Sequence, residues 1–189
     1  MTDKRKFLSY KGNYKNLKVY QKAECVYDVT YIFAHRFLER GDRTIDQMVQ
    51  AARSGKQNIV EGNAAAVMSS ETELKLYNVA RASLQELLVD YEDFLRVRGL
   101  EQWALDDPRH IQARNVCKEH NDSQYYRSII DSRSEETIAN IAIILIHQTD
   151  ALLNALFEAR KQHFVQNGGV REELTRTRLA SRKQNKQRG

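Results

Sequence analysis

Proline, glycine and cysteine are scarce in this sequence. Its 189 residues include one proline, eight glycines and two cysteines. Because proline and glycine interrupt regular structure, their scarcity favours a few long elements, and long elements are helices. Cys25 and Cys117 are too few and too far apart for a zinc site or a disulfide framework, so we expect reduced, partly buried thiols.

Long apolar runs are also missing. No window approaches the roughly 18 apolar residues of a membrane span, and no apolar signal segment follows the charged residues 1–6. We therefore expect a cytoplasmic protein. Hydrophobic residues make up 41% of the chain and charged residues 29%, which is the balance of a folded domain rather than of a disordered or membrane protein.

Charge is unevenly distributed. The first 18 residues carry six Lys/Arg and one Asp, and residues 171–189 carry seven Lys/Arg and two Glu, so each end has a net charge of +5. The section between them carries 17 positive and 22 negative residues, a net charge of −5. Basic ends suit a polyanion such as RNA, DNA or an acidic partner surface. The alternative is that they are solubilising tails.

Hydrophobic periodicity predicts an all-α protein, an antiparallel up-down four-helix bundle with an inserted short helical segment and basic termini. We expect the bundle to span residues 17–168, preceded by a basic arm at 1–16 and followed by a basic tail at 169–189. The long helices are expected at about 17–40, 43–67, 70–99 and 132–164.

Serines and glycines mark the expected helix ends. Ser70 with Glu73 three residues later is typical of a capping box, and Ser132 with Glu135 repeats the pattern. Gly99 follows the third helix as a C-terminal cap. Glycines within the second helix have a different meaning: each costs about 1 kcal/mol relative to alanine. We expect close backbone approach to a neighbour, or a bend, at Gly55 and Gly62.

Residues 100–132 break the helical pattern. We interpret them as an insertion with a short helix at about 109–118 followed by a loop. In the helix that comes next, Asn140 is the one polar residue within 138–146. A helix that is apolar nearly all round is buried on several sides, so we expect part of this surface to face another subunit.

Motifs that carry chemistry do not emerge. Ser54-Gly55-Lys56 lacks the first glycine and the final Ser/Thr of a phosphate-binding loop. The five histidines have no metal-binding spacing, and no Gly-x-Ser-x-Gly segment is present. We expect no enzymatic activity, no cofactor and no metal.

Arg81 interrupts the apolar seam of the third helix. Because a buried unpaired charge is costly, we expect Arg81 to form an ion pair with Glu61 that fixes helix register, rather than to act in catalysis.

Aromatic and basic residues alternate near the start of the chain, where Tyr10, Tyr14 and Tyr20 interleave with lysines. This pattern suits stacking on single-stranded nucleic acid. It equally suits an arm that packs on a neighbour, and both interpretations remain open.

Two segments resemble a known family. Asn58-Ile59-Val60-Glu61-Gly62 resembles the Asn-Ile-x-Glu-Gly signature of the four-helix-bundle proteins encoded in 23S rRNA intervening sequences. Residues 80–87, Ala-Arg-Ala-Ser-Leu-Gln-Glu-Leu, resemble the Ala-Arg-x-Ser-Leu-x-Glu-Leu segment on the third helix of that family. The resemblance covers roughly residues 17–98 and continues at 133–164.

This resemblance implies a homopentamer. It relates the chain to the accessory variability determinant of diversity-generating retroelements, a nucleic-acid-binding partner of a reverse transcriptase. The insertion and the basic tail resemble a longer, suffix-domain variant of the family. The family's signature residues, for which we expect a structural role, fall on Asn58, Glu61, Gly62, Arg81, Ser83 and Glu86.

Together these observations lead to two hypotheses. The first is a non-enzymatic homo-oligomeric scaffold that binds RNA or DNA through its basic ends, as an accessory to a reverse transcriptase or to rRNA. Phosphate contacts of this kind give affinity that falls steeply with salt. The residues expected to make them are Lys4, Arg5, Lys6, Lys11, Lys15, Lys18, Arg176, Arg178, Arg182, Lys183, Lys186 and Arg188. The alternative is a protein–protein interaction scaffold with no nucleic-acid role, whose tails bind an acidic protein.

Overall fold

The structure, a computed structural model, describes residues 13–168, 172 and 175–179. Every regular element among them is a helix, so the expected all-α class is confirmed for this part of the chain. The elements are the 3-10 helix η1 (Tyr14–Asn16) and the α-helices α1 (Lys18–Phe37), α2 (Arg43–Ala65), α3 (Ser70–Arg98), α4 (Pro108–Glu119), α5 (Ser123–Ile130) and α6 (Glu135–Asn167).

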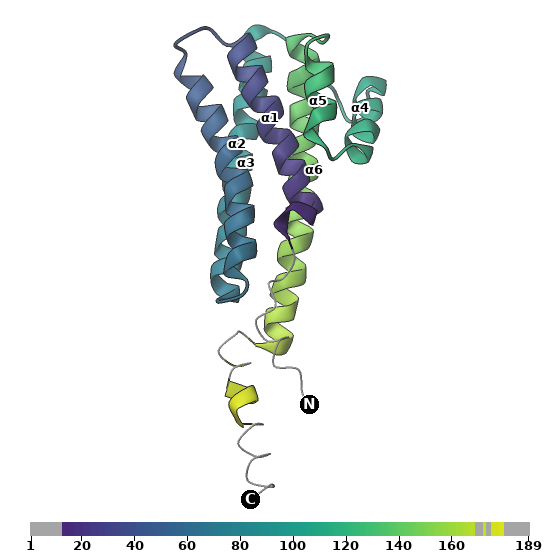
Figure 1. Ribbon diagram of the computed structural model, residues 1–189. Helices are drawn as coiled ribbons and strands as arrows, with labels where there is room; N and C mark the ends of the chain where they lie inside the picture. Colours follow the sequence, from purple (N-terminus) through teal and green to yellow (C-terminus); the bar gives the residue numbers. More distant parts are fainter. Residues whose placement is uncertain (1–12, 169–171, 173–174, 180–189) are drawn as a thin grey trace, which may run out of the picture.

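The four long helices lie side by side (Figure 1). Helix α1 packs on α2 and α6, and α3 packs on the same two helices, so the four enclose one core. Near the C-terminal ends of α1 and α3, Phe33 of α1 packs against Tyr91 and Phe94 of α3, with ring centroids 4.9 and 4.7 Å apart. Helix α4 packs on α6 and α5 packs on α1, so the insertion lies along the α1–α6 edge.

The N-terminal caps of α3 and α6 are not the serines that the sequence predicted. Ser69, not Ser70, caps α3, and its Oγ accepts a hydrogen bond from the Thr72 main-chain N–H at 3.2 Å. In α6 the cap is Ser134 rather than Ser132, and the partner is the N–H of Thr137 at 3.3 Å. Both caps therefore have the spacing Ser-x-x-Thr. With Ser69 as the cap, Glu73 lies one position beyond the place that a capping box requires, and its side chain is buried against α6.

The insertion contains one more helix than expected. The helix predicted at 109–118 is present as α4, but the loop predicted after it is wrong, because residues 123–130 form α5. Asp122 starts this helix by accepting hydrogen bonds from the main-chain N–H groups of Gln124 and Tyr125. The buried side of α5 consists of Tyr126 and Ile130, one helical turn apart.

The apolar segment of α6 is fully covered within one chain. Every residue from Ile138 to Ile146 is at most 9% exposed. The expectation that part of this surface faces another subunit is therefore wrong, since α1, α3 and the insertion cover it. Residues 135–166 form the one stretch among the described helices that is long and apolar enough to cross a membrane. This finding differs from the expectation that no window of the sequence approaches a membrane span. The most apolar part of this stretch is nevertheless buried in the core.

Candidate functional site

The residues expected to contact phosphates fall into two groups. Lys15, Lys18, Arg176 and Arg178 lie in the described part of the chain, and all four are exposed. The others lie outside the described residues; they are Lys4, Arg5, Lys6, Lys11, Arg182, Lys183, Lys186 and Arg188.

The start of α1 and the end of α6 lie at the same end of the molecule (Figure 1). Lys15 and Lys18 are on η1 and the first turn of α1. Helix α6 extends past the start of α1, and its residues 161–166, which include Lys161 and His163, are exposed on all sides. The described elements to which the two basic segments of the sequence are joined therefore lie at one end of the folded body.

The tyrosines beside these lysines pack on their own chain. Tyr14 and Tyr20 meet edge to face, with ring centroids 4.9 Å apart. Tyr20 is 8% exposed and its hydroxyl donates to Glu24 at 2.8 Å. Burial and this carboxylate both raise the pKa of Tyr20. Tyr20 is thus not free to stack on nucleic acid, and Tyr14 is half-buried beside it; Tyr10 lies outside the described residues.

Three of the family-like residues lie where α2 meets α3. A Cβ atom added to Gly62 would lie 2.6 Å from the Tyr77 ring, so α3 approaches the α2 backbone closely, as expected. Asn58 donates to the carbonyl oxygen of Ser54 at 2.9 Å. The Ser54 and Ser83 hydroxyls are 2.9 Å apart across the same seam.

The charged members of this set are Glu61, Glu86 and Arg81. Glu61 and Glu86 are exposed, and Glu86 lines the same surface hollow as Ser54 and Ser83. Arg81 does not pair with Glu61, contrary to expectation: its Nε lies 3.0 Å from Oδ1 of Asp150 on α6. The correction has a geometric reason, because the side of α3 that carries Arg81 faces α6 rather than α2.

A second ion pair, between Glu73 and Arg160, also joins α3 to α6. Glu73 is 1% exposed, accepts a hydrogen bond from the Tyr77 hydroxyl at 3.1 Å, and lies 3.0 Å from Nε of Arg160.

Lys22 is a buried cation that sequence reasoning missed. It is 2% exposed, and its Nζ donates to the main-chain carbonyls of Cys117 and of His120, the latter at 3.0 Å. These carbonyls end α4, where backbone acceptors lack partners and a cation is favoured. Burial lowers the pKa of Lys22. One signal was available, since Lys22 sits three and four residues from the buried Val19 and Val26.

The two thiols lie close to this cation. Cys25 and Cys117 are free and fully buried, more so than expected. Burial raises the pKa of the Cys25 thiol from 9.0 to about 12 and also raises that of Cys117. Thiolates are the reactive form of cysteine, so these environments keep both groups unreactive near neutral pH.

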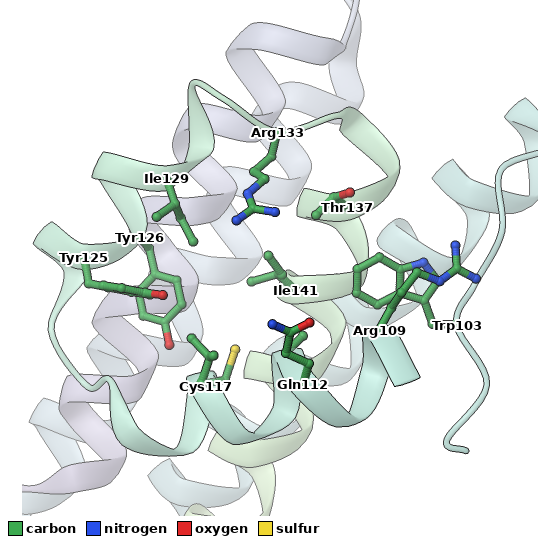
Figure 2. Close-up of a pocket in the computed structure, with 12 residues that line it drawn as sticks. Trp103, Arg109, Gln112, Cys117, Tyr125, Tyr126, Ile129, Arg133, Thr137 and Ile141 are labelled. Atoms are coloured by element: carbon green, nitrogen blue, oxygen red, sulfur yellow. The ribbon is translucent and has the colours of Figure 1, made fainter. Parts of the chain in front are cut away.

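A cavity opens between the two helices of the insertion (Figure 2). Helix α4 packs on α6 and α5 packs on α1, so the two diverge and leave a space of about 240 Å³ between them. Ile141 and Thr137 of α6 line one side of it. Aromatic and aliphatic side chains dominate the remaining walls, and two guanidinium groups, Arg109 and Arg133, complete the lining.

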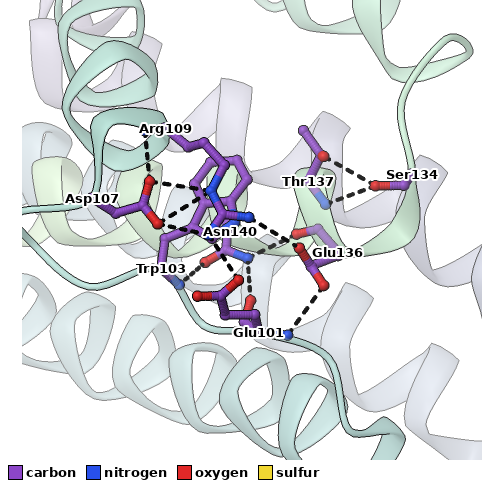
Figure 3. A network of polar contacts seen from close by, with 8 residues as sticks. All are labelled: Glu101, Trp103, Asp107, Arg109, Ser134, Glu136, Thr137 and Asn140. Atoms are coloured by element: carbon purple, nitrogen blue, oxygen red, sulfur yellow. Dashed lines mark hydrogen bonds and ion pairs between the residues drawn. The ribbon is translucent and has the colours of Figure 1, made fainter.

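Arg109 is held by carboxylates, whereas Arg133 is not. Figure 3 shows Arg109 within a polar network in which its Nη2 lies 2.6 Å from Asp107 and 2.7 Å from Glu101. These hydrogen bonds lower the pKa of Asp107. In the described part of the chain, the exposed side chain of Arg133 makes no hydrogen bond or ion pair.

Comparison with protein-family models, with curated proteins and with solved structures finds no match to this chain. Within the described residues, no group of three or more His, Cys, Asp or Glu side chains is arranged to hold a metal ion.

Proposed function

We propose that the chain is a non-enzymatic, homo-oligomeric scaffold that binds RNA or DNA at the end of the molecule where α1 begins and α6 ends. The observation that carries this proposal is the arrangement of the two basic segments. They are separated by about 150 residues of a net acidic section, yet the described elements to which they are joined, η1 and the end of α6, lie at one end of the body. Two +5 segments joined to one end attract a polyanion, while the acidic body disfavours contacts elsewhere.

The exposed residues at this end are suited to backbone contacts. Lysine and arginine bind phosphates without reading sequence, and Lys15, Lys18, Arg176 and Arg178 are exposed. The nearby tyrosines are packed against the protein, so base stacking has no part in this proposal. We expect binding to be sequence-independent and strongly dependent on salt.

The proposed assembly rests on the family resemblance alone. We propose an up-down four-helix bundle of the 23S rRNA intervening-sequence type, which forms a cytoplasmic homopentamer and serves a reverse transcriptase or rRNA. The close contact of Gly62 with Tyr77 and the Ser54–Ser83 contact support a structural role for the resembling motifs. Light scattering on a sizing column tests the assembly: a mass near five subunits supports it, and a monomer contradicts it.

Binding is tested by fluorescence anisotropy with a short single-stranded RNA and a DNA duplex of equal length, over a series of salt concentrations. The variant Lys15→Gln/Lys18→Gln removes two exposed charges at the proposed site. We expect weaker binding, and a slope of log affinity against log salt that is shallower by about one to two.

A charge-matched control lies at the opposite end of the molecule. Arg40 and Arg43 are exposed at the connection between α1 and α2, and Arg40→Gln/Arg43→Gln should leave the salt slope unchanged. Removal of residues 171–189 should flatten the slope further. Equal slopes for both double variants would contradict the site. Failure to bind either nucleic acid, with binding to poly-glutamate, would favour the alternative scaffold for acidic proteins.

A further inference from the structure

The cavity between α4 and α5 has a lining that selects for negative charge. None of the described residues that line it carries a carboxylate. Of its two cations, Arg109 is neutralised by Asp107 and Glu101. Arg133 has no counter-ion among the described residues, and its side chain points toward the cavity (Figure 2). A guanidinium prefers a planar oxyanion that can accept two parallel hydrogen bonds, which makes a carboxylate the matching group.

The remaining walls select for a flat, apolar body. Tyr125, Tyr126 and Ile129 of α5 face Ala113 and Val116 of α4 across the space. An apolar cavity of 150 Å³ holds benzene, so a space of about 240 Å³ holds a body of roughly one to two aromatic rings. Sites of this kind, mainly apolar with a few convergent polar groups, are typical of small-molecule binding.

We propose that this cavity binds a small aromatic carboxylate, with the ring system between α4 and α5 and the carboxylate on the Arg133 guanidinium. Thr137 and Gln112 also line the cavity and supply further polar groups. The site is formed within one chain and lies in the insertion, apart from the end of the molecule proposed to bind nucleic acid. A failure of the proposed nucleic-acid binding would therefore not affect this proposal.

The protein carries a specific reporter for this site. Trp103 is the single tryptophan of the chain and lines the cavity. Its indole Nε1–H is buried and makes no hydrogen bond in the described part of the chain. The indole cross-peak in a ¹H–¹⁵N NMR spectrum of the full chain is therefore unique, and it should respond to an aromatic ring placed nearby.

The experiment is a titration of the full chain with 2-naphthoate and with its neutral isostere 2-naphthamide. We expect a saturable shift of the Trp103 indole peak, with naphthoate binding about tenfold or more tightly than naphthamide. Arg133→Gln should weaken naphthoate by about tenfold or more and leave naphthamide nearly unchanged. Because Arg133 is exposed, this variant should fold normally. Arg53→Gln, an exposed arginine on α2, is the matched control and should have no effect.

Three kinds of result would overturn the proposal. The first is no saturable shift at millimolar naphthoate. The second is equal affinity for the acid and the amide, or an Arg133→Gln variant that binds naphthoate as the wild type does. The third is a parallel titration in which AMP moves the same peak at a lower concentration than naphthoate, which would assign the cavity to nucleotides instead.

Discussion

Asn140 of α6 accepts a hydrogen bond from the main-chain N–H of Trp103, with the Asn140 Oδ1 2.8 Å from the nitrogen (Figure 3). Its Nδ2 donates to the carbonyl oxygens of Glu101 at 2.8 Å and Glu136 at 2.9 Å. The one polar side chain in the apolar stretch of α6 thus joins that helix to the chain segment that leads into the insertion. A buried amide with both ends satisfied specifies one position for that segment.

Replacement of Asn140 should therefore loosen the insertion. In Asn140→Ala the Trp103 N–H and the Glu101 carbonyl lose their partner inside the protein, and we expect a loss of about 2–4 kcal/mol in the free energy of unfolding. Urea denaturation followed by circular dichroism measures it. Asn154→Ala, an exposed position on the same helix, is the control and should cost less than about 0.5 kcal/mol. Equal losses in the two variants would contradict a special role for Asn140.

The ion pair between Arg81 and Asp150 should contribute little to stability. Their side chains are 37% and 24% exposed, and we expect a coupling free energy of about 0.5–1 kcal/mol. A double-mutant cycle with Arg81→Ala and Asp150→Ala measures this value. The same cycle between Arg81 and Glu61 should give no coupling. The reverse result would restore Glu61 as the partner.

Alanine at the two α2 glycines should have opposite consequences. At Gly62 the new Cβ would lie 2.6 Å from the buried ring of Tyr77, whose hydroxyl is held by Glu73, so the ring has little room to move. Overpacking of this kind costs about 1–3 kcal/mol, more than the helix gains from alanine. At Gly55 the nearest atom is 3.0 Å away on the flexible end of Leu84.

We therefore expect Gly62→Ala to lower the thermal unfolding midpoint, while Gly55→Ala leaves it unchanged or raises it. A gain of about 1 kcal/mol from helix propensity is available at both positions. Differential scanning calorimetry of the two variants provides a matched comparison. A similar decrease of the unfolding midpoint in both variants would show that the Leu84 side chain adjusts to the new methyl group no better than the Tyr77 ring does.

Cys25 should make the protein less stable at alkaline pH. Its pKa is raised from 9.0 to about 12 by burial, so between these values the unfolded state loses a proton that the folded state keeps. The stability that the buried thiol contributes is fully present below pH 9 and is lost as pH rises through this window. At pH 10 the loss amounts to about 1 kcal/mol.

The check is urea denaturation of the wild type and Cys25→Ala between pH 7 and pH 10. The wild type should lose more stability than the variant over this interval. Comparison of the two proteins subtracts the opposite effect of Lys22, whose lowered pKa makes the wild type gain stability as pH rises toward 10.5. If the free energy of unfolding had the same pH dependence in the two proteins, the raised pKa of the buried Cys25 thiol would be contradicted.

Periodicity in the sequence predicted the four long helices to within a few residues, because each buries a stripe of side chains at helical spacing. Helix α5 escaped this reasoning, since eight residues with two buried side chains, Tyr126 and Ile130, make no recognisable stripe. The partner of Arg81 depended on which helix its side of α3 would face. That orientation depends on how the helices pack together, and the sequence of α3 alone does not indicate it.

The candidate sites were less accessible to sequence reasoning. Lys22 donates to backbone carbonyls at the end of a distant helix. Because every residue type has a backbone carbonyl, the sequence does not reveal this kind of partner. The cavity beside Arg133 is a space left by two diverging helices, and an empty space has no sequence motif. The basic segments, in contrast, were visible from composition, although the fold decides that η1 and the end of α6, to which they are joined, lie at one end of the molecule.

The complete burial of residues 138–146 bears on how the chain is made. A ribosome synthesises the segments of α1, α3 and α4, which pack on α6, before this isoleucine-rich stretch emerges. Exposed apolar segments of partly folded chains are a main route to aggregation. The order of elements along the chain therefore shortens the time for which the most aggregation-prone segment of this protein is without its partners.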